Sequence, residues 1–502
     1  MQKISIWNAT AKTGPVYPPL VGNTNTEVTI VGGGITGVLT AYFLAQKGIK
    51  PVLIESLDIG GGTTAHSTGN LYCMVDEKLQ KVKSKFDSNT ARKVAQSRQS
   101  TVDIIEQLVQ QHNIDCNFMR APWYLYAFDE KDNNIIEKEY ETAVECGVAN
   151  AKLLESMPGI PYKTSKSLVV ENQAQFHPLK FVQHIASIAT QLGAHIYERT
   201  KMLNYEVSNN QYIIHTTNGI ITSNKLVMAT HMPKGFMPVQ TLVYPYREYG
   251  VAARLNNDLQ AGIYWGIYDD PKKYSFRPYT HQGQNYIMVI GENHKTGHKE
   301  HNEESFSKLE EFLRNRFNIT DIAYRWGGQH YKSADSIPFI GKSDLGEGLY
   351  YATGLATDGL TYGTLAGMII SDLITGTQNP WSDVYDPKRF TPLASAKEFL
   401  KENADVAVQY FKDIPFKIDA KELDDVKAGE GKVLSLNGKR CAAYRDENDH
   451  VHVVSAVCPH MKCIVHWNKG EKSWDCPCHG SRFTFDGRVI EGPAIHDLDK
   501  MQ

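Results

Sequence analysis

The chain has 502 residues, more than one hydrophobic core usually supports, so we expect two or three domains. Its 53 basic and 56 acidic residues are nearly balanced, which gives no electrostatic reason to expect nucleic acid or an anionic membrane as a partner. No apolar run approaches the length of a membrane span, and residues 1–15 lack the basic start and apolar stretch of a signal peptide. We therefore expect a cytoplasmic protein without a membrane span.

The first predicted unit is a strand, a glycine turn, a helix and a second strand. Residues 27–37 form a β-branched run that enters a turn with GxGxxG spacing, residues 38–46 follow a helical pattern, and residues 50–55 form a strand that ends at Glu55. Glycines let the backbone approach a pyrophosphate at a helix N-terminus, and the terminal acid can accept hydrogen bonds from a ribose. The expected dinucleotide contacts in the turn are Gly32, Gly34, Ile35, Thr36 and Gly37.

A loop of small residues, 60–69, follows directly. With the preceding turn it resembles the D-amino-acid oxidase superfamily of flavoproteins, in which such a loop wraps the flavin. The resemblance implies FAD as a cofactor, with contacts from Thr63, Thr64, His66 and Ser67. His66 stands in a GxTxHxxG setting that some dimethylglycine and sarcosine dehydrogenases use for a covalent flavin link. Both a covalent and a noncovalent contact are open.

The same resemblance implies a multidomain α/β (α+β) fold. In it, a Rossmann-like FAD domain is interleaved with an antiparallel-sheet substrate domain. Past these two domains, the strands expected at residues 431–436 and 451–457 add a small all-β domain. The expected segments are 1–80, 165–243 and 335–380 for the FAD domain, 81–164 and 244–334 for the substrate domain, 381–411 for a linker, and 412–502 for the C-terminal domain.

Aromatic and basic residues gather between residues 244 and 279. Most of the tyrosines are expected to be ordinary strand or core residues, but the resembled family builds its flavin-facing wall from this sheet. Arg247 or Arg277 is expected to bind a carboxylate through a bidentate fork, and Tyr246 to hold an alkylammonium by a cation-π contact. His330 is a candidate to accept the proton that leaves an amine before its C-H bond donates hydride. A structural histidine is the alternative.

Residues 351–364 precede a helical pattern over residues 365–374. In the resembled family, the positive end of such a helix points toward the flavin C2 carbonyl, where it stabilises the anionic reduced ring. The resemblance therefore adds further FAD contacts at Gly354, Gly359, Leu360 and Thr361.

Two cysteine and histidine clusters lie near the end of the chain. Cys458 and His460 form a CxH pair, and Cys476 and His479 form a CxxH pair. They supply the ligand set of a Rieske [2Fe-2S] centre, in which cysteines hold one iron and histidines hold the other. A structural zinc site is the alternative, because zinc takes the same residue types. Since CxH opposite CxxH is unusual for zinc, we expect a one-electron iron-sulfur cluster.

This segment resembles high-potential members of the Rieske family, which gives roles to further residues. The resemblance implies a disulfide between Cys463 and Cys478 that ties the two cluster loops together, with two buried free thiols as the alternative. Ser481 matches the position whose hydroxyl donates to a bridging sulfide. Phe483 stands where the family has tyrosine, which removes one hydrogen-bond donor to the cluster. We therefore expect a reduction potential below the upper end of the family's range.

Together the motifs predict an FAD- and [2Fe-2S]-dependent dehydrogenase or oxidase. It would oxidise a C-N bond of a small-molecule amine or amino acid, N-methylated ones included, and pass electrons singly from reduced flavin to the cluster. The expected partner is a one-electron acceptor or donor protein or a quinone. The alternative is an electron-transfer adaptor or redox sensor whose Rieske domain docks on a partner.

Overall fold

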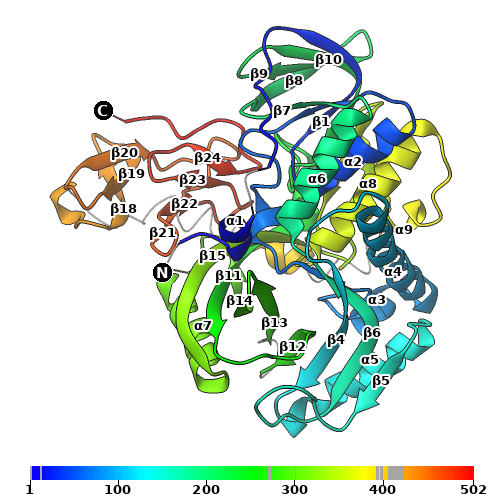
Figure 1. The fold of residues 1–502 in the computed structure, drawn as a ribbon. Coiled ribbons are helices and arrows are strands. Elements are labelled where there is room, and N and C mark those ends of the chain that lie inside the picture. Colours follow the sequence, from blue (N-terminus) through cyan, green and yellow to red (C-terminus); the bar gives the residue numbers. More distant parts are fainter. Residues whose placement is uncertain are drawn as a thin grey trace.

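The structure, a computed structural model, describes residues 3–11, 14–268, 273–299, 301–389, 391, 395, 399–404 and 423–501. Residues 405–411 of the expected linker and residues 412–422 of the expected C-terminal domain lie outside the described residues. Figure 1 shows a large body that contains two sheets, and a smaller C-terminal lobe, coloured orange and red, that packs against its side.

One sheet, here called the parallel sheet, has the strand order β16-β17-β10-β1-β2-β7, and its strands pair in parallel from β17 to β7. Its strands are β1 (Thr24–Val31), β2 (Val52–Ile54), β7 (His195–Tyr197), β8 (Met202–Ser208), β9 (Gln211–Thr216), β10 (Ile220–Met228), β16 (Phe339–Lys342) and β17 (Leu349–Thr353). Helix α2 (Ile35–Gln46) joins β1 to β2 and packs against α6 (Pro178–Gln191) and α8 (Gly359–Thr375). Because α2 is apolar on nearly all sides, it is buried between these neighbours.

The second sheet, here called the large sheet, has the order β15-β11-β14-β13-β12-β4-β6-β3, with β5 beside β6. Its strands are β3 (Asn70–Leu71), β4 (Met119–Ala127), β5 (Ala151–Leu154), β6 (Ser167–Gln175), β11 (Val243–Leu255), β12 (Ile263–Ile267), β13 (Lys273–His281), β14 (Gln284–Lys295) and β15 (Ile319–Ser333). The predicted boundaries at residues 80 and 165 differ from this arrangement, because β3 and β6 pair within the large sheet and not with the parallel sheet. The β-branched and apolar residues of β6 are buried against β4, which fixes that register.

The remaining elements of the body cover these sheets. Helix α7 packs on β11 and β14, and α4 packs on α8. Their bounds are α1 (Ile6–Thr10), η1 (Thr63–His66), α3 (Leu79–Lys85), α4 (Ser88–Gln111), η2 (Glu130–Asp132), α5 (Asn133–Glu145), η3 (Pro238–Leu242), α7 (Glu303–Arg316) and α9 (Ser382–Tyr385).

The C-terminal lobe is built from two small antiparallel sheets, which confirms the predicted all-β domain. Its elements are η4 (Leu423–Asp425), β18 (Gly431–Leu436), β19 (Lys439–Arg445), β20 (Val451–Ser455), β21 (His466–Asn468), β22 (Ser473–Asp475), β23 (Arg482–Thr484) and β24 (Val489–Glu491). Trp467 and Trp474 pack in its core with ring centroids 4.7 Å apart. The parallel sheet, the large sheet and this lobe agree with the predicted fold class.

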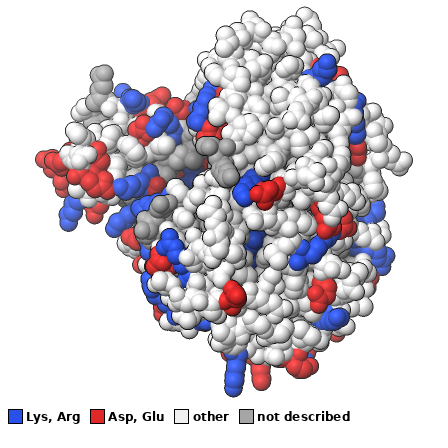
Figure 2. Space-filling model, viewed as in Figure 1, with Lys and Arg blue, Asp and Glu red and all other residues white. Residues whose placement is uncertain are grey.

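The surface carries charges of both signs. On the face shown in Figure 2, Lys and Arg alternate with Asp and Glu in small groups over the body, while acidic side chains gather at the outer end of the lobe. Among the helices that the structure describes, none combines the length and apolar character needed to cross a bilayer.

Candidate functional site

A cavity of about 460 Å³ lies where the parallel sheet, the large sheet and the C-terminal lobe meet. The turn after β1, Glu55 and residues 200–202 form one end, and residues 328–331 of β15 with residues 355–360 at the start of α8 form the other. Residues 62–68 lie between them, since Thr64 contacts Ile35 of the turn and His66 contacts Trp326 of β15. Residues between 488 and 497 of the lobe line its side, so all three parts of the molecule contribute to one chamber.

The glycine turn leaves its backbone open to this cavity. Gly32 has φ +112°, and a Cβ there would clash with the carbonyl oxygen of Ala229. A Cβ at Gly37 would clash with the carbonyl oxygen of Gly32. At the end of β2, Glu55 accepts a hydrogen bond from the Gly33 amide at 2.7 Å, which holds the turn in place. Only glycine meets these positions, and the N-terminus of α2 therefore faces the cavity as the sequence predicts.

The small-residue loop forms η1 beside this turn. Thr64 accepts a hydrogen bond from the Ile35 amide at 3.1 Å, and Ser67 accepts one from the indole of Trp7 at 2.7 Å through its carbonyl oxygen. His66 Nδ1 donates to the Gly62 carbonyl at 2.8 Å, which leaves the Nε2 lone pair free. Burial lowers the pKa of His66, so its imidazole is neutral at neutral pH. This geometry accommodates both a covalent and a noncovalent flavin contact.

The start of α8 closes the other end of the cavity. Gly359 and Leu360 line it, whereas Gly354 and Thr361 lie outside its lining. Asp358 precedes the helix and forms a fully buried ion pair with Arg98 at 3.3 Å. Two helix N-termini, an acid at the end of β2 and glycines that no Cβ can replace surround one elongated cavity. These residues fit a bound FAD.

The sequence predicts that Arg247 or Arg277 binds a substrate carboxylate, but the structure engages both elsewhere. Arg247 is 1% exposed and pairs with Glu471 of the C-terminal lobe. Arg277 donates to the carbonyl oxygens of Gly69 at 2.7 Å and Thr68 at 3.3 Å. Burial lowers the pKa of Arg277 to about 9. Neither guanidinium lines the cavity.

Two other predicted catalytic residues lie together on the large sheet. His330 lines the cavity. Tyr246 stacks behind it, with the rings 5.8 Å apart, and its hydroxyl points to Glu402 at 3.5 Å. Tyr246 therefore supports His330 from outside the cavity. Burial, followed by Lys332, holds the pKa of His330 well below its usual range, so this imidazole is neutral.

Sequence reasoning missed the residues that surround His330 in the cavity. Glu248 on β11 lines the cavity, and its Oε2 lies 4.0 Å from His330 Nδ1. The Asn293 amide donates to Glu248 Oε1 at 3.2 Å and to His330 Nε2 at 3.3 Å. Asp76 and Lys273 form an ion pair on the same wall. Glu248, Asn293 and Lys273 come from β11, β14 and β13, and Asp76 comes from the segment after β3. Tertiary packing and not local spacing brings these side chains together.

The predicted metal ligands meet in the C-terminal lobe. Cys458 and Cys476 are buried, and their thiols contact each other. The rings of His460 and His479 lie 5.0 Å apart. His479 Nδ1 is buried without a hydrogen-bond partner. His460 Nε2 donates to Gln240 at 3.1 Å, so Nδ1 of its neutral ring carries no proton. Two thiols and two unprotonated imidazole nitrogens fit the asymmetric ligand set of a Rieske cluster.

A disulfide and a hydroxyl complete these loops. Cys463 and Cys478 form a disulfide, which confirms the pairing that the resemblance implied. The Cys476 sulfur lies within 4.8 Å of both disulfide sulfurs. Ser481 accepts a hydrogen bond from the Ala494 amide at 3.0 Å and donates to Cys458. Phe483 is fully buried opposite Trp474 and offers no donor.

Comparison with known proteins identifies both parts of the molecule. A family model described as FAD dependent oxidoreductase matches residues 27–373, and a model described as Rieske [2Fe-2S] domain matches residues 417–502. The chain belongs to the FAD-dependent oxidoreductases. Its C-terminal lobe is a Rieske domain, so the cofactors of this FAD-dependent oxidoreductase are FAD and a [2Fe-2S] cluster.

Relatives share either the whole arrangement or the FAD-dependent part. YhfW of Bacillus subtilis (strain 168), described as a Rieske 2Fe-2S iron-sulfur protein, is 34% identical over 97% of this chain and 95% of its own length. The gamma-glutamylputrescine oxidoreductase of Escherichia coli (strain K12) is 21% identical over 79% of this chain and 92% of its own length. The structure of glycine oxidase from Geobacillus kaustophilus matches 73% of this chain and 99% of that chain with a TM-score of 0.61 at 17% identity, which shows a shared fold.

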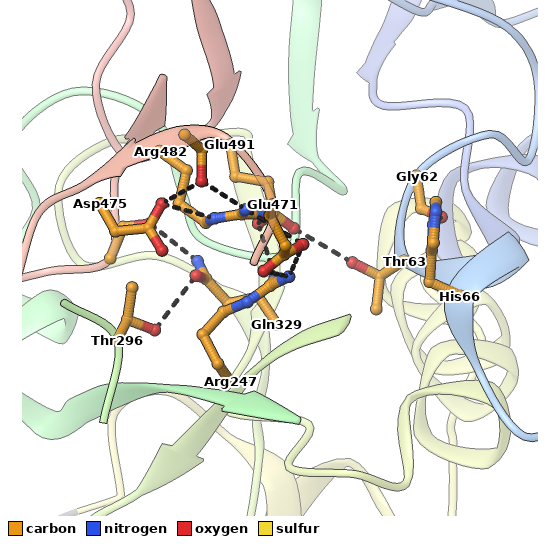
Figure 3. A network of polar contacts seen from close by, with 12 residues as sticks. Gly62, Thr63, His66, Arg247, Thr296, Gln329, Glu471, Asp475, Arg482 and Glu491 are labelled. Atoms are coloured by element: carbon orange, nitrogen blue, oxygen red, sulfur yellow. Dashed lines mark hydrogen bonds and ion pairs between the residues drawn. The ribbon is translucent and has the colours of Figure 1, made fainter. Parts of the chain in front are cut away.

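A buried network of charges joins the Rieske domain to the rest of this oxidoreductase (Figure 3). Arg247 of β11 pairs with Glu471, and its Nη1 lies 3.5 Å from Glu491. Within the Rieske domain, Arg482 lies 3.2 Å from each of these carboxylates and 2.9 Å from Asp475. Both arginines thus share two carboxylates, and the Rieske domain is fixed on the large sheet by paired charges.

Two further contacts extend this interface to the cavity. Thr63 of η1 donates to Glu491 at 3.5 Å, so the loop of residues 62–68 contacts the Rieske domain directly (Figure 3). Gln329 of β15 donates to the Gly480 carbonyl at 2.8 Å and accepts from Thr296 at 3.2 Å. Gly480 follows His479, a predicted cluster ligand, in the chain. Strand β15 therefore contacts the cavity and a cluster loop at once.

Proposed function

We propose that this oxidoreductase oxidises a C-N bond of an amine or amino acid, N-methylated ones included, and passes the electrons singly through its Rieske cluster to an external protein or quinone. FAD supplies the link between the two stages, since a flavin can accept two electrons from a substrate and release them one at a time to a one-electron cluster. Relatives named gamma-glutamylputrescine oxidoreductase and glycine oxidase support an amine or amino-acid substrate.

One observation carries this proposal: a short hydrogen-bonded connection joins the cavity wall to a cluster loop. Tyr331 lines the cavity. Gln329 donates both to the Tyr331 hydroxyl at 2.7 Å and to the Gly480 carbonyl at 2.8 Å, and the Tyr331 hydroxyl donates to the Gly492 carbonyl at 3.0 Å. Strand β15 therefore contacts the cavity and a cluster loop together, which favours electron exchange inside one molecule.

Anaerobic mixing of the intact protein with a panel of amines and amino acids tests the proposal. Flavin absorbance should bleach on addition of a substrate, and the electron paramagnetic resonance signal of the reduced cluster should follow within the same molecule. Bleached flavin beside a cluster that stays oxidised would contradict the electron path. A cluster that a partner protein reduces, with no response to any amine or amino acid, would instead support the electron-transfer adaptor.

A further inference from the structure

The flavin end of the cavity contains one carboxylate that no cation neutralises. Glu248 accepts a hydrogen bond from Asn293 and faces His330, and within the described part of the chain no Lys or Arg forms an ion pair with it. Its side chain is 20% exposed, and that exposure is toward the cavity. Since a buried carboxylate without a cationic partner is costly, this position suits a ligand that brings a positive charge.

The other charges on the same wall are already matched. Asp76 of the segment after β3 pairs with Lys273 of β13. Glu77 pairs with Lys332 of β15 at 3.2 Å. Burial opposes ionisation of both acids, but their lysines outweigh it and hold the pKa of Asp76 and of Glu77 below the usual range. The acid and the lysine of each pair therefore stay charged at neutral pH, and their charges compensate within the pair. Glu248 is left as the carboxylate without an opposite charge beside it.

No free cation stands ready for a substrate carboxylate at this end. Arg247 and Arg277 are engaged outside the cavity. Among the lysines and arginines that line it, Lys273 is paired with Asp76, and three lie beside Glu55 and the C-terminal lobe at the opposite end. Those three are Lys201, Lys234 and Arg488. A bidentate arginine fork, the usual partner of a carboxylate, is therefore missing from the described wall around His330.

We infer that the substrate is an amine without an α-carboxylate, and that Glu248 binds its ammonium group. This inference rests on the proposed function and narrows its substrate class. Asn293 holds Glu248 Oε1, while Oε2 faces the cavity. Because Asn293 donates to His330 Nε2, the proton of His330 sits on Nδ1 and points toward Glu248. His330 therefore orients Glu248, and Glu248, not His330, receives the substrate proton.

The proposed oxidation of the amine conserves atoms and electrons. The ammonium loses one proton to the Glu248 carboxylate, which frees the nitrogen lone pair. The C-H bond next to nitrogen breaks, its hydrogen and two electrons pass to FAD, and a C=N bond forms. Water adds to the resulting iminium and releases a carbonyl compound and ammonia or a smaller amine. FAD is the oxidant, and the proton taken by Glu248 leaves to solvent.

Binding should depend on pH because Glu248 must be ionised. Burial, followed by the charge of Asp76, raises the pKa of Glu248 to about 7, against the opposing effect of Lys332 and Lys273. His330 stays neutral in this range, so it adds no competing charge. Affinity for a cationic amine should therefore rise as the pH increases from 6 to 8.

The test uses the holoenzyme under anaerobic conditions with two matched pairs of probes: benzylamine with phenylglycine, and n-butylamine with norvaline. Each pair differs by one carboxylate. Dissociation constants are taken from the perturbation of the oxidised flavin spectrum before any bleaching. We expect the amines to bind more tightly than the amino acids, and Glu248→Gln to weaken amine binding about 10- to 100-fold and to abolish its dependence on pH.

Two further variants control the experiment. Glu248→Asp keeps the charge and should retain part of the affinity together with the pH dependence. Asp321→Asn removes an exposed carboxylate from the far end of β15, where it pairs with Arg254, and should leave binding unchanged. Flavin content and the cluster signal of each variant establish that it has folded.

Tighter binding of the amino acids, full amine affinity in Glu248→Gln, or no binding of either amine to the unmodified protein would overturn the inference. Different outcomes contradict this inference and the proposed function. Amines that bind through Glu248 but never bleach the flavin would leave the cation site intact and refute the proposed oxidation. Amino acids that reduce flavin and cluster with no effect of Glu248→Gln would do the reverse.

Discussion

Ser481 is the side chain whose hydroxyl connects the two cluster loops. It donates to Cys458 of the first loop and accepts from Ala494 beyond the second. A donor to a ligand sulfur stabilises the more negative, reduced cluster and so raises its potential. Phe483, two residues later, supplies no such donor. Among the hydroxyl groups described in β23 and in the loop before it, that of Ser481 is therefore the one that we expect to affect the reduction potential of the cluster.

We predict that Ser481→Ala lowers the midpoint potential of the cluster. Loss of about 1 kcal/mol of preferential stabilisation of the reduced state corresponds to about 40 mV for one electron. A redox titration followed by electron paramagnetic resonance measures it. Thr484→Val removes a hydroxyl that serves only the turn of the same hairpin, through Asp486 and Arg488, and should not shift the potential. Equal shifts in both variants would contradict the role of Ser481.

At the scale of elements, the pair β11 and β15 has two functional faces. Glu248 and His330 point into the cavity, whereas Arg247 contacts the Rieske domain, and Gln329 both lines the cavity and contacts that domain. Successive side chains of a strand alternate between faces, so adjacent residues such as Arg247 and Glu248 contact different parts of the molecule. The register between the strands, with Arg247 opposite Gln329 and Glu248 opposite Gly328, places the two residues that contact the Rieske domain side by side.

This alternation explains which parts of the site the sequence predicts. The glycine turn, Glu55 and η1 are contiguous in the chain, so local spacing identifies them, and the cluster loops are equally compact. Strand β11 is covered on both faces, and neither side is marked by solvent-facing polar residues. The sequence therefore cannot tell that Arg247 faces the Rieske domain and Glu248 the cavity.

The connection through β15 gives a prediction about electron transfer. Gln329→Leu removes the side chain that joins the Tyr331 hydroxyl to Gly480. We expect several-fold slower reduction of the cluster after the flavin bleaches, with the bleaching itself unchanged. Stopped-flow absorbance separates the two phases.

Thr296→Val is the matched control for this variant. It removes the hydroxyl that donates to the other side of the same Gln329 amide, away from Gly480. An equal slowing in Thr296→Val, or bleaching that slows as much as cluster reduction, would indicate a general loosening of the interface and contradict a specific connection.

At the scale of the whole molecule, the charge network decides whether the Rieske domain stays on the large sheet. Arg247 is almost fully buried between Glu471 and Glu491, and a buried pair that loses one partner leaves an uncompensated charge. Because Arg247 belongs to the large sheet and both of its carboxylate partners belong to the Rieske domain, the cost falls on the association of the two parts and not on either part alone.

We predict that Arg247→Leu destabilises the docked arrangement by about 3–5 kcal/mol. Urea unfolding should show a lower midpoint for the interdomain step, and limited proteolysis should release the Rieske domain sooner. Arg254→Leu lies on the same strand but breaks an exposed pair with Asp321, and should cost less than about 1 kcal/mol. Similar effects of the two substitutions would show that burial of the network is not what holds the domains together.

Docking of the Rieske domain should also weaken in acid. Burial raises the pKa of Glu471 and of Glu491, but Arg247 and Arg482 outweigh it and hold both pKa values below the ordinary 4.5. A carboxylate with a lowered pKa contributes its full stabilisation above the unfolded value and loses it as the pH falls through the folded value. His231 beside Glu491 has a pKa lowered by burial to about 4, so it stays neutral over most of this range.

We therefore expect the rate of cluster reduction by bound flavin and the compactness measured by small-angle scattering to be constant from pH 5 to pH 8 and to fall below about pH 4.5. In Arg247→Leu the lowered pKa values move back toward 4.5 and the decline begins at higher pH, whereas an acid transition at the same pH in both proteins would assign it to other groups.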